Sequence, residues 1–91
     1  MTAINRDAAT DLARKEIDQL AEKIGMAVEI YSEETREIAQ GWVFFYNSEE
    51  YMRTGNYRFQ LAGNGPILVM REGKIHYLPT AIPWEDAVSQ L

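Results

Sequence analysis

The sequence predicts an α+β domain, in which an N-terminal helix and a short C-terminal helix pack on a mainly antiparallel sheet of about four strands. A change of hydrophobic period indicates this class. Apolar residues recur every three or four positions up to residue 25 and then alternate with polar ones. Short loops join the strand-like segments, which favours antiparallel pairing and a two-layer sandwich with both helices on one side. We expect residues 1–91 to form a single domain.

The first 25 residues predict the N-terminal helix. Asn5 is a suitable N-cap, and Gly25 stands where a left-handed glycine ends a helix. The apolar positions of one helical face are Ile4, Ala8, Leu12, Ala13, Ile17, Leu20, Ala21 and Ile24. The opposite face is polar, so we expect the helix to pack on the sheet by one face only.

Two strands are expected after this helix. Residues 28–31 alternate in polarity and predict a short strand, which a polar turn at residues 32–35 ends. A second, longer strand is expected from about Glu37 to Asn47. Its last residues are apolar on both faces. This indicates either a central strand covered on both sides or a strand with one face left for a partner.

A short helix and a loop follow the long strand. Residues 48–55 begin with the good N-cap residue Ser48, continue with two glutamates and end at Gly55, which together predict a single short helix. Residues 63–66 read Gly-Asn-Gly-Pro and predict a loop, because glycine and asparagine tolerate positive φ and proline restricts the entry to the next strand.

The C-terminal third predicts a hairpin and a final helix. Residues 67–70 and 75–78 are the two strands of the hairpin, which turns around residues 72–73. Pro83 suits the first turn of a helix, so we expect the final helix from Trp84 to about Gln90.

The composition describes a small acidic chain without cysteine. Fourteen acidic and nine basic residues give a formal net charge of −5. This balance disfavours nucleic acids and anionic membranes as partners and favours a basic partner. The lack of cysteine excludes disulfides, thiolate zinc sites and a cysteine nucleophile. No apolar stretch approaches the roughly 20 residues that span a bilayer, so we expect a cytoplasmic protein.

Side chains that could carry chemistry have simpler structural interpretations. His76 is the only histidine and could act as a general base beside a glutamate, but no nucleophile or second histidine accompanies it. The glutamate groups within residues 33–37 and 49–50 could hold a divalent cation, yet their spacings match no calcium loop. Turn solvation and helix dipoles explain both groups. We therefore expect no catalytic residue, no metal site, no cofactor and no enzyme activity.

The aromatic segment of the long strand leaves three interpretations open. Alternation puts Trp42, Phe44 and Tyr46 on one face and Val43 and Phe45 on the other. The N-terminal helix can cover only one of these faces. Core packing under the terminal helix, a homodimer and a protein-binding surface are the three ways to cover the other.

Five segments of the second half carry a resemblance to a known family. They are GWVFFYN from Gly41, YMRTG from Tyr51, LAGNGPILV from Leu61, GKIHYL from Gly73 and the pair Thr80-Ala81. In this order they resemble the immunity protein 35 family, also described as the YrhB-like domain, from Gly41 to the C-terminus. The leading helix fits this family only as a generic amphipathic segment.

The resemblance implies a function that depends on binding. It implies an α+β antidote of bacterial polymorphic toxin systems, which binds and neutralises a cognate toxin by stoichiometric blocking. The family has no catalytic motif to transfer and therefore implies no cofactor. A member in enteric bacteria has been linked with chaperone-like behaviour, so the alternative is a holdase or stress-related binding protein.

The charge distribution suggests where a basic toxin would bind. Residues 1–39 carry nine acidic and five basic residues, which is most of the surplus negative charge. Electrostatic steering would draw a basic partner to this part of the chain. The residues expected to contact the partner are Asp11, Asp18, Glu22, Glu33, Glu34, Glu37, Trp42 and Tyr46.

Overall fold

The computed structural model describes residues 3–61 and 65–91. The α-helices in these ranges are α1 (Arg6–Ile24), α2 (Glu49–Thr54) and α3 (Trp84–Ser89), and the 3₁₀ helices are η1 (Ser32–Glu34) and η2 (Tyr57–Phe59). The strands are β1 (Val28–Ile30), β2 (Arg36–Ile38), β3 (Gly41–Phe44), β4 (Tyr46–Ser48), β5 (Ile67–Met70) and β6 (Ile75–Tyr77). Two residues of the predicted loop, Gly63 and Asn64, lie outside the described ranges.

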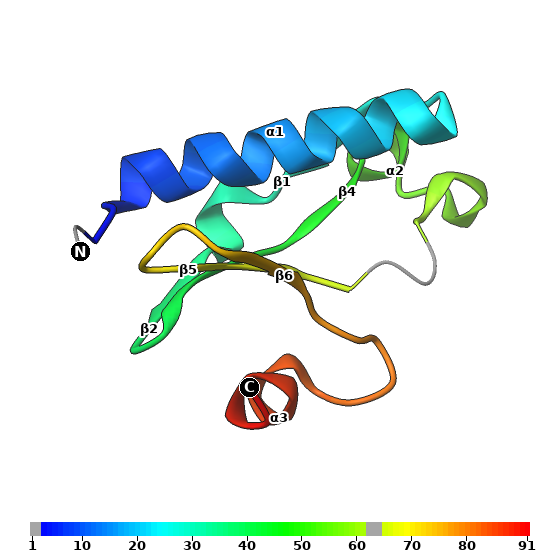
Figure 1. Ribbon diagram of the computed structural model, residues 1–91. Coiled ribbons are helices and arrows are strands. Elements are labelled where there is room, and N and C mark those ends of the chain that lie inside the picture. Colours follow the sequence, from blue (N-terminus) through cyan, green and yellow to red (C-terminus); the bar gives the residue numbers. More distant parts are fainter. Residues whose placement is uncertain (1–2, 62–64) are drawn as a thin grey trace.

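The strands form two antiparallel sheets, which confirms the α+β class. One sheet pairs β1 with β4, and the other has the order β2-β3-β5-β6. In Figure 1, α1 lies above the four-stranded sheet and α3 lies below it. The two helices therefore cover opposite faces of this sheet, whereas the sequence placed both on one side. The four-stranded sheet therefore has a helix on each face, so the structure has three layers where two were expected.

The prediction of a single strand from Glu37 to Asn47 is wrong, because this segment takes part in three strands. Residues 39–40 turn the chain, so that β2 folds back on β3 with Ile38 opposite Gly41. Beyond Phe45 the chain leaves the four-stranded sheet, and β4 pairs with β1. The alternation of apolar residues continues through the break at Phe45, so the hydrophobic pattern does not show it.

The alternation predicted for residues 42–46 is confirmed, and each face has its own core. Trp42, Phe44 and Tyr46 belong to the core under α1, whereas Val43 and Phe45 face the core under α3. The buried residues under α1 are Ala9, Ala13, Ile17, Val28, Ile30, Trp42, Phe44, Tyr46, Ile67 and Val69, and those over α3 are Val43, Leu68, Leu78, Ala87 and Val88. The terminal helix therefore covers the sheet face for which a second subunit was considered.

The predicted caps of α1 are confirmed. The side chain of Asn5 accepts a hydrogen bond from the backbone N–H of Ala8 at 2.9 Å, and Gly25 ends the helix in the left-handed conformation with φ 68°. These local signals fix both ends of the helix. No helix in residues 3–61 and 65–91 is long and apolar enough to cross a bilayer.

The short helix α2 is also capped as predicted, and its N-cap has a second role. The hydroxyl of Ser48 accepts from the backbone N–H of Tyr51 at 3.0 Å and donates to the carbonyl of Phe59. Gly55 ends the helix with φ 71°. Ser48 is fully buried, so this one hydroxyl joins β4, α2 and η2 inside the protein.

Tyr46 is buried with its hydroxyl group satisfied inside the protein. The phenol donates a hydrogen bond to the carbonyl of Gly65 at 2.8 Å, and burial raises the pKa of Tyr46 to about 12 from its usual 10.0. Between these two values the unfolded chain loses a proton that the folded chain keeps. Tyr46 therefore stabilises the fold below about pH 10 and loses this contribution as the pH rises toward about 12.

We expect the free energy of unfolding to fall steadily above about pH 10, and Tyr46→Phe to make this fall shallower. Urea unfolding followed by far-UV circular dichroism from pH 8 to 12 measures both slopes. The matched control is Tyr57→Phe, which removes a hydroxyl from a ring that is 78% exposed and should leave the wild-type profile. A Tyr46→Phe profile parallel to that of the wild type would contradict the linkage.

Candidate functional site

The predicted acidic residues of α1 form one exposed line along the helix. Asp11, Asp18 and Glu22 are all exposed, and we call these three residues the α1 stripe. Their helical spacing puts them on one side of α1, opposite the buried residues Ala13 and Ile17. The stripe therefore faces away from both sheets and is open to a partner.

Glu33 and Glu34 lie elsewhere, at the edge of a hollow that the sequence did not indicate. Both are exposed on η1, the turn that follows β1. Two adjoining cavities of about 260 Å³ each share Tyr31 and Glu34. We call this surface the Tyr31 hollow, and the residues that define it are Tyr31, Glu33, Glu34, Phe45 and Met52. The hollow adjoins the end of β1, which packs under α1, whereas the α1 stripe lies on the opposite side of α1. The hollow and the α1 stripe are therefore two separate acidic surfaces.

Glu37 is held by an arginine of the same chain. Arg71 donates to the carboxylate of Glu37 at 3.1 Å and to the carbonyls of Ile38 at 2.7 Å and Ala39 at 2.9 Å. Its guanidinium carbon also lies 4.8 Å from the centre of the Trp42 ring. Glu37 is therefore part of a contact that fixes the turn between β2 and β3, and its charge already has a partner.

The two aromatic residues predicted to contact a partner are inside the protein. The exposed fractions of Trp42 and Tyr46 are 2% and 8%, and both side chains pack in the core under α1. No hydrogen-bond acceptor among the described residues reaches the indole N–H of Trp42. A partner has no access to these rings in the folded protein, so we do not retain them as contact residues.

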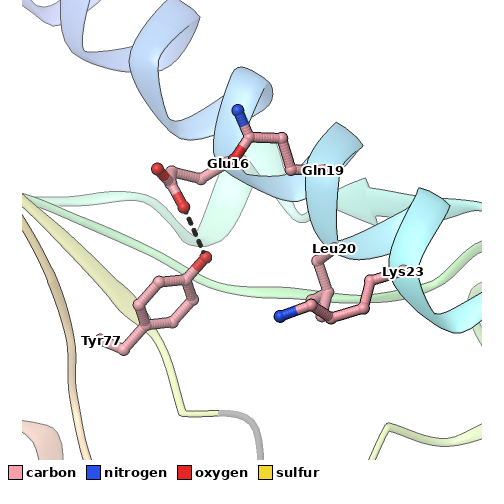
Figure 2. Close-up of a pocket in the computed structure, with 5 residues that line it drawn as sticks. All are labelled: Glu16, Gln19, Leu20, Lys23 and Tyr77. Carbon is pink, nitrogen blue, oxygen red and sulfur yellow. Dashed lines mark hydrogen bonds between the residues drawn. The ribbon is translucent and has the colours of Figure 1, made fainter.

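Figure 2 shows a third cavity, of about 380 Å³, between α1 and β6. Glu16, Gln19, Leu20 and Lys23 line it from α1, and Tyr77 lines it from β6. The Tyr77 hydroxyl donates to the Glu16 carboxylate at 2.7 Å. Partial burial is the largest cause of the raised pKa of Tyr77, and this hydrogen bond raises the pKa further. A phenol that holds its proton this firmly is suited to joining α1 to the sheet and unsuited to proton transfer near neutral pH.

The groups considered for chemistry at the sequence level are not brought together. His76 is half-buried on β6, opposite Leu68 of β5. In the part of the chain that the structure describes, no three His, Asp or Glu side chains are grouped to hold a metal ion. The surfaces described here offer carboxylates, aromatic rings and a thioether, a set suited to binding a basic partner.

Sequence reasoning missed the residues that matter most around these surfaces. Arg71 stands beside a hairpin turn in the sequence, and nothing local predicts that its side chain reaches residues 37–39, more than 30 positions earlier. Tyr31, Phe45 and Met52 come from three different segments, and only folding makes them neighbours. The sequence offered no local signal for this grouping, because the hydrophobic alternation continues through the break at Phe45.

Comparison with known proteins gives a family match along almost the whole chain. The family described as immunity protein 35 matches residues 6–90. A curated relative, the "Uncharacterized protein YrhB" of Escherichia coli (strain K12), is 41% identical over 49 residues. This alignment covers 53% of the chain and 52% of the relative, so the chain spans about half the length of this relative. No solved structure is significantly similar. The match to residues 6–90 includes all the described helices and strands, and on this basis the chain belongs to the immunity protein 35 family.

Proposed function

We propose that the protein is the cytoplasmic antidote of a bacterial polymorphic toxin system and neutralises a cognate toxin by binding it stoichiometrically, without catalysis. The observation that carries this proposal is the family match over residues 6–90. The proposed partner is a toxin with a basic surface, because the chain has a net charge of −5 and exposes acidic residues on two separate surfaces.

The packing of the chain supports a role as a firm blocking surface. The α1 helix is 19 residues long, is capped at both ends and packs against the sheet through Ala9, Ala13 and Ile17. A salt bridge of 3.7 Å between Arg14 and Glu29 adds a contact to β1 at its side. Surfaces on such elements lose little conformational entropy on binding, which favours tight complexes.

Coexpression tests this proposal directly. The chain is produced together with each candidate toxin domain from the genes that neighbour its own. We expect growth to be restored and a one-to-one complex to elute on size exclusion. Salt screens steering by surface charge, so association should slow as the salt concentration rises from about 50 to about 500 mM. Over this range the Debye length shortens severalfold. A toxin domain from an unrelated system is the specificity control. Absence of both protection and complex would overturn the proposal.

The chaperone-like alternative stays a prediction, and it concerns which surface of the protein would bind unfolded clients. A holdase needs an exposed apolar surface for unfolded clients, and the aromatic strand β3 is buried between α1 and α3. A holdase would therefore need another surface. Suppression of the aggregation of an unrelated heat-denatured enzyme, without protection from the toxin domain, would favour this alternative over the antidote.

A further inference from the structure

We propose that the Tyr31 hollow receives an arginine side chain of the toxin. This inference rests on the proposed function, because it assigns the surface by which the antidote recognises its partner. It requires that the hollow fit both parts of an arginine, the apolar stem and the planar cation at its end.

The lining of the hollow provides for both parts. Tyr31, Phe45 and Met52 form apolar walls, and the side chain of Met52 is 37% exposed. Phe45 is held in place by an edge-on contact with Trp84, with ring centres 6.1 Å apart. Glu34 lies at the point that the two cavities share. A long side chain can therefore bury its methylene groups against the walls and bring its charge to a carboxylate.

Glu33 and Glu34 have charges that no other described residue pairs. The salt bridges among the described residues join Arg14 to Glu29, Arg53 to Glu50 and Arg71 to Glu37. Arg53 of α2 is thus engaged with Glu50 within its own helix. Two unpaired carboxylates beside apolar walls attract a cation and disfavour a second copy of this acidic chain.

Arginine fits this surface better than lysine does. A guanidinium is planar, so it can lie on an aromatic ring while its edge donates two hydrogen bonds to a carboxylate. The chain already contains a related arrangement, in which Arg71 lies over the Trp42 ring at 4.8 Å and donates one hydrogen bond to the Glu37 carboxylate at 3.1 Å. The Tyr31 hollow offers the same two partners, a ring and a carboxylate, without the arginine.

A small probe tests the hollow without the toxin. The full chain, labelled with ¹⁵N, is titrated with N-acetyl-arginine amide, and N-acetyl-citrulline amide serves as the uncharged probe of the same shape. We expect amide shifts concentrated on η1 and Met52, with a dissociation constant on the order of 1 mM for the arginine probe. The citrulline probe should bind at least fivefold more weakly. Equal binding of the two probes, or shifts centred on the α1 stripe, would overturn the proposal.

Matched double variants give the second test. Glu33→Gln with Glu34→Gln removes two charges from the hollow, and Asp11→Asn with Asp18→Asn removes two charges from the α1 stripe. All four residues are exposed, so both variants should melt like the wild type. The first variant should bind the arginine probe at least fivefold more weakly, and the second should bind it like the wild type. Equal binding by all three proteins would overturn the proposal.

The same variants separate this inference from the proposed function. We expect Glu33→Gln with Glu34→Gln to bind the toxin domain at least tenfold more weakly than the wild type does, and more weakly than the α1 stripe variant does. If the wild type protects cells and the first variant binds the toxin equally well, the proposed function stands and the assignment of the hollow fails. If the wild type binds no toxin domain, the proposed function fails, and so does the assignment of the arginine to a toxin.

Discussion

Gly41→Ala should lower the free energy of unfolding by about 3 kcal/mol or more, which is a large share of the total stability of a domain of this size. A Cβ atom at position 41 would lie 2.1 Å from the carbonyl oxygen of Val69 and 2.8 Å from the Cα of Met70. Both atoms belong to the backbone of β5, which is held between β3 and β6 and cannot move aside. The φ of Gly41, 156°, adds conformational strain for any other residue.

Gly55→Ala is the matched control for this change. Gly55 also has a positive φ, 71°, but a Cβ there would meet no atom within 4 Å. The expected cost is about 1 kcal/mol, from conformation alone. Urea unfolding followed by far-UV circular dichroism measures both variants. Equal losses would show that the close approach of β3 and β5 does not determine the effect.

Phe44→Ala should cost about 3–5 kcal/mol. The ring is 1% exposed and lies in the core under α1, where it is among the largest fully buried side chains. Its removal leaves a cavity between α1 and β3, and the neighbours are held by helix caps and strand pairing that limit their collapse. The midpoint of urea unfolding at constant slope measures the loss.

Two further variants show whether the volume of the buried ring is responsible. Phe44→Leu keeps an apolar side chain of similar size and should cost less than about 1.5 kcal/mol. Tyr57→Ala removes an aromatic ring that is 78% exposed and should change the free energy of unfolding by less than about 0.5 kcal/mol. A loss at Phe44→Ala no larger than the loss at Tyr57→Ala would contradict the packing described here.

Most of the secondary structure could be predicted because its signals are local. The ends of α1 depend on Asn5 and Gly25, and the start of α2 depends on Ser48, each acting within three or four residues. The hairpin of β5 and β6 follows from two apolar runs around a glycine turn. Sequence reasoning succeeded where neighbouring residues alone decide the conformation.

The errors arose where contacts between distant segments determine the structure. The transfer of the chain from one sheet to the other at Phe45 depends on β1, which provides a partner for β4. Hydrophobic alternation predicted which residues share a face but not which helix covers that face. The sequence therefore left the second face of β3 open, and α3 covers it.

The candidate site was predictable only in part for the same reason. Acidic exposed residues such as Glu33 and Glu34 follow from composition and turn signals. Trp42 and Tyr46 were expected to contact a partner while core packing was left open, and both are in the core, because aromatic strands serve both roles and the sequence does not tell them apart. The ion pair between Glu37 and Arg71 joins residues that are 34 positions apart in the sequence, so no local pattern predicts it.

The lengths of the outer strands affect how the protein behaves at high concentration. In the order β2-β3-β5-β6, the strands at the two edges are β2 and β6, and each has three residues. Exposed backbone N–H and C=O groups at a sheet edge are the usual starting point for aggregation between chains. Edges this short, with charged Arg36 and Glu37 on one of them, give a neighbouring chain few positions to pair with. The longer apolar strands, β3 and β5, lie inside the sheet, so the segments most prone to amyloid-like stacking are also the best protected.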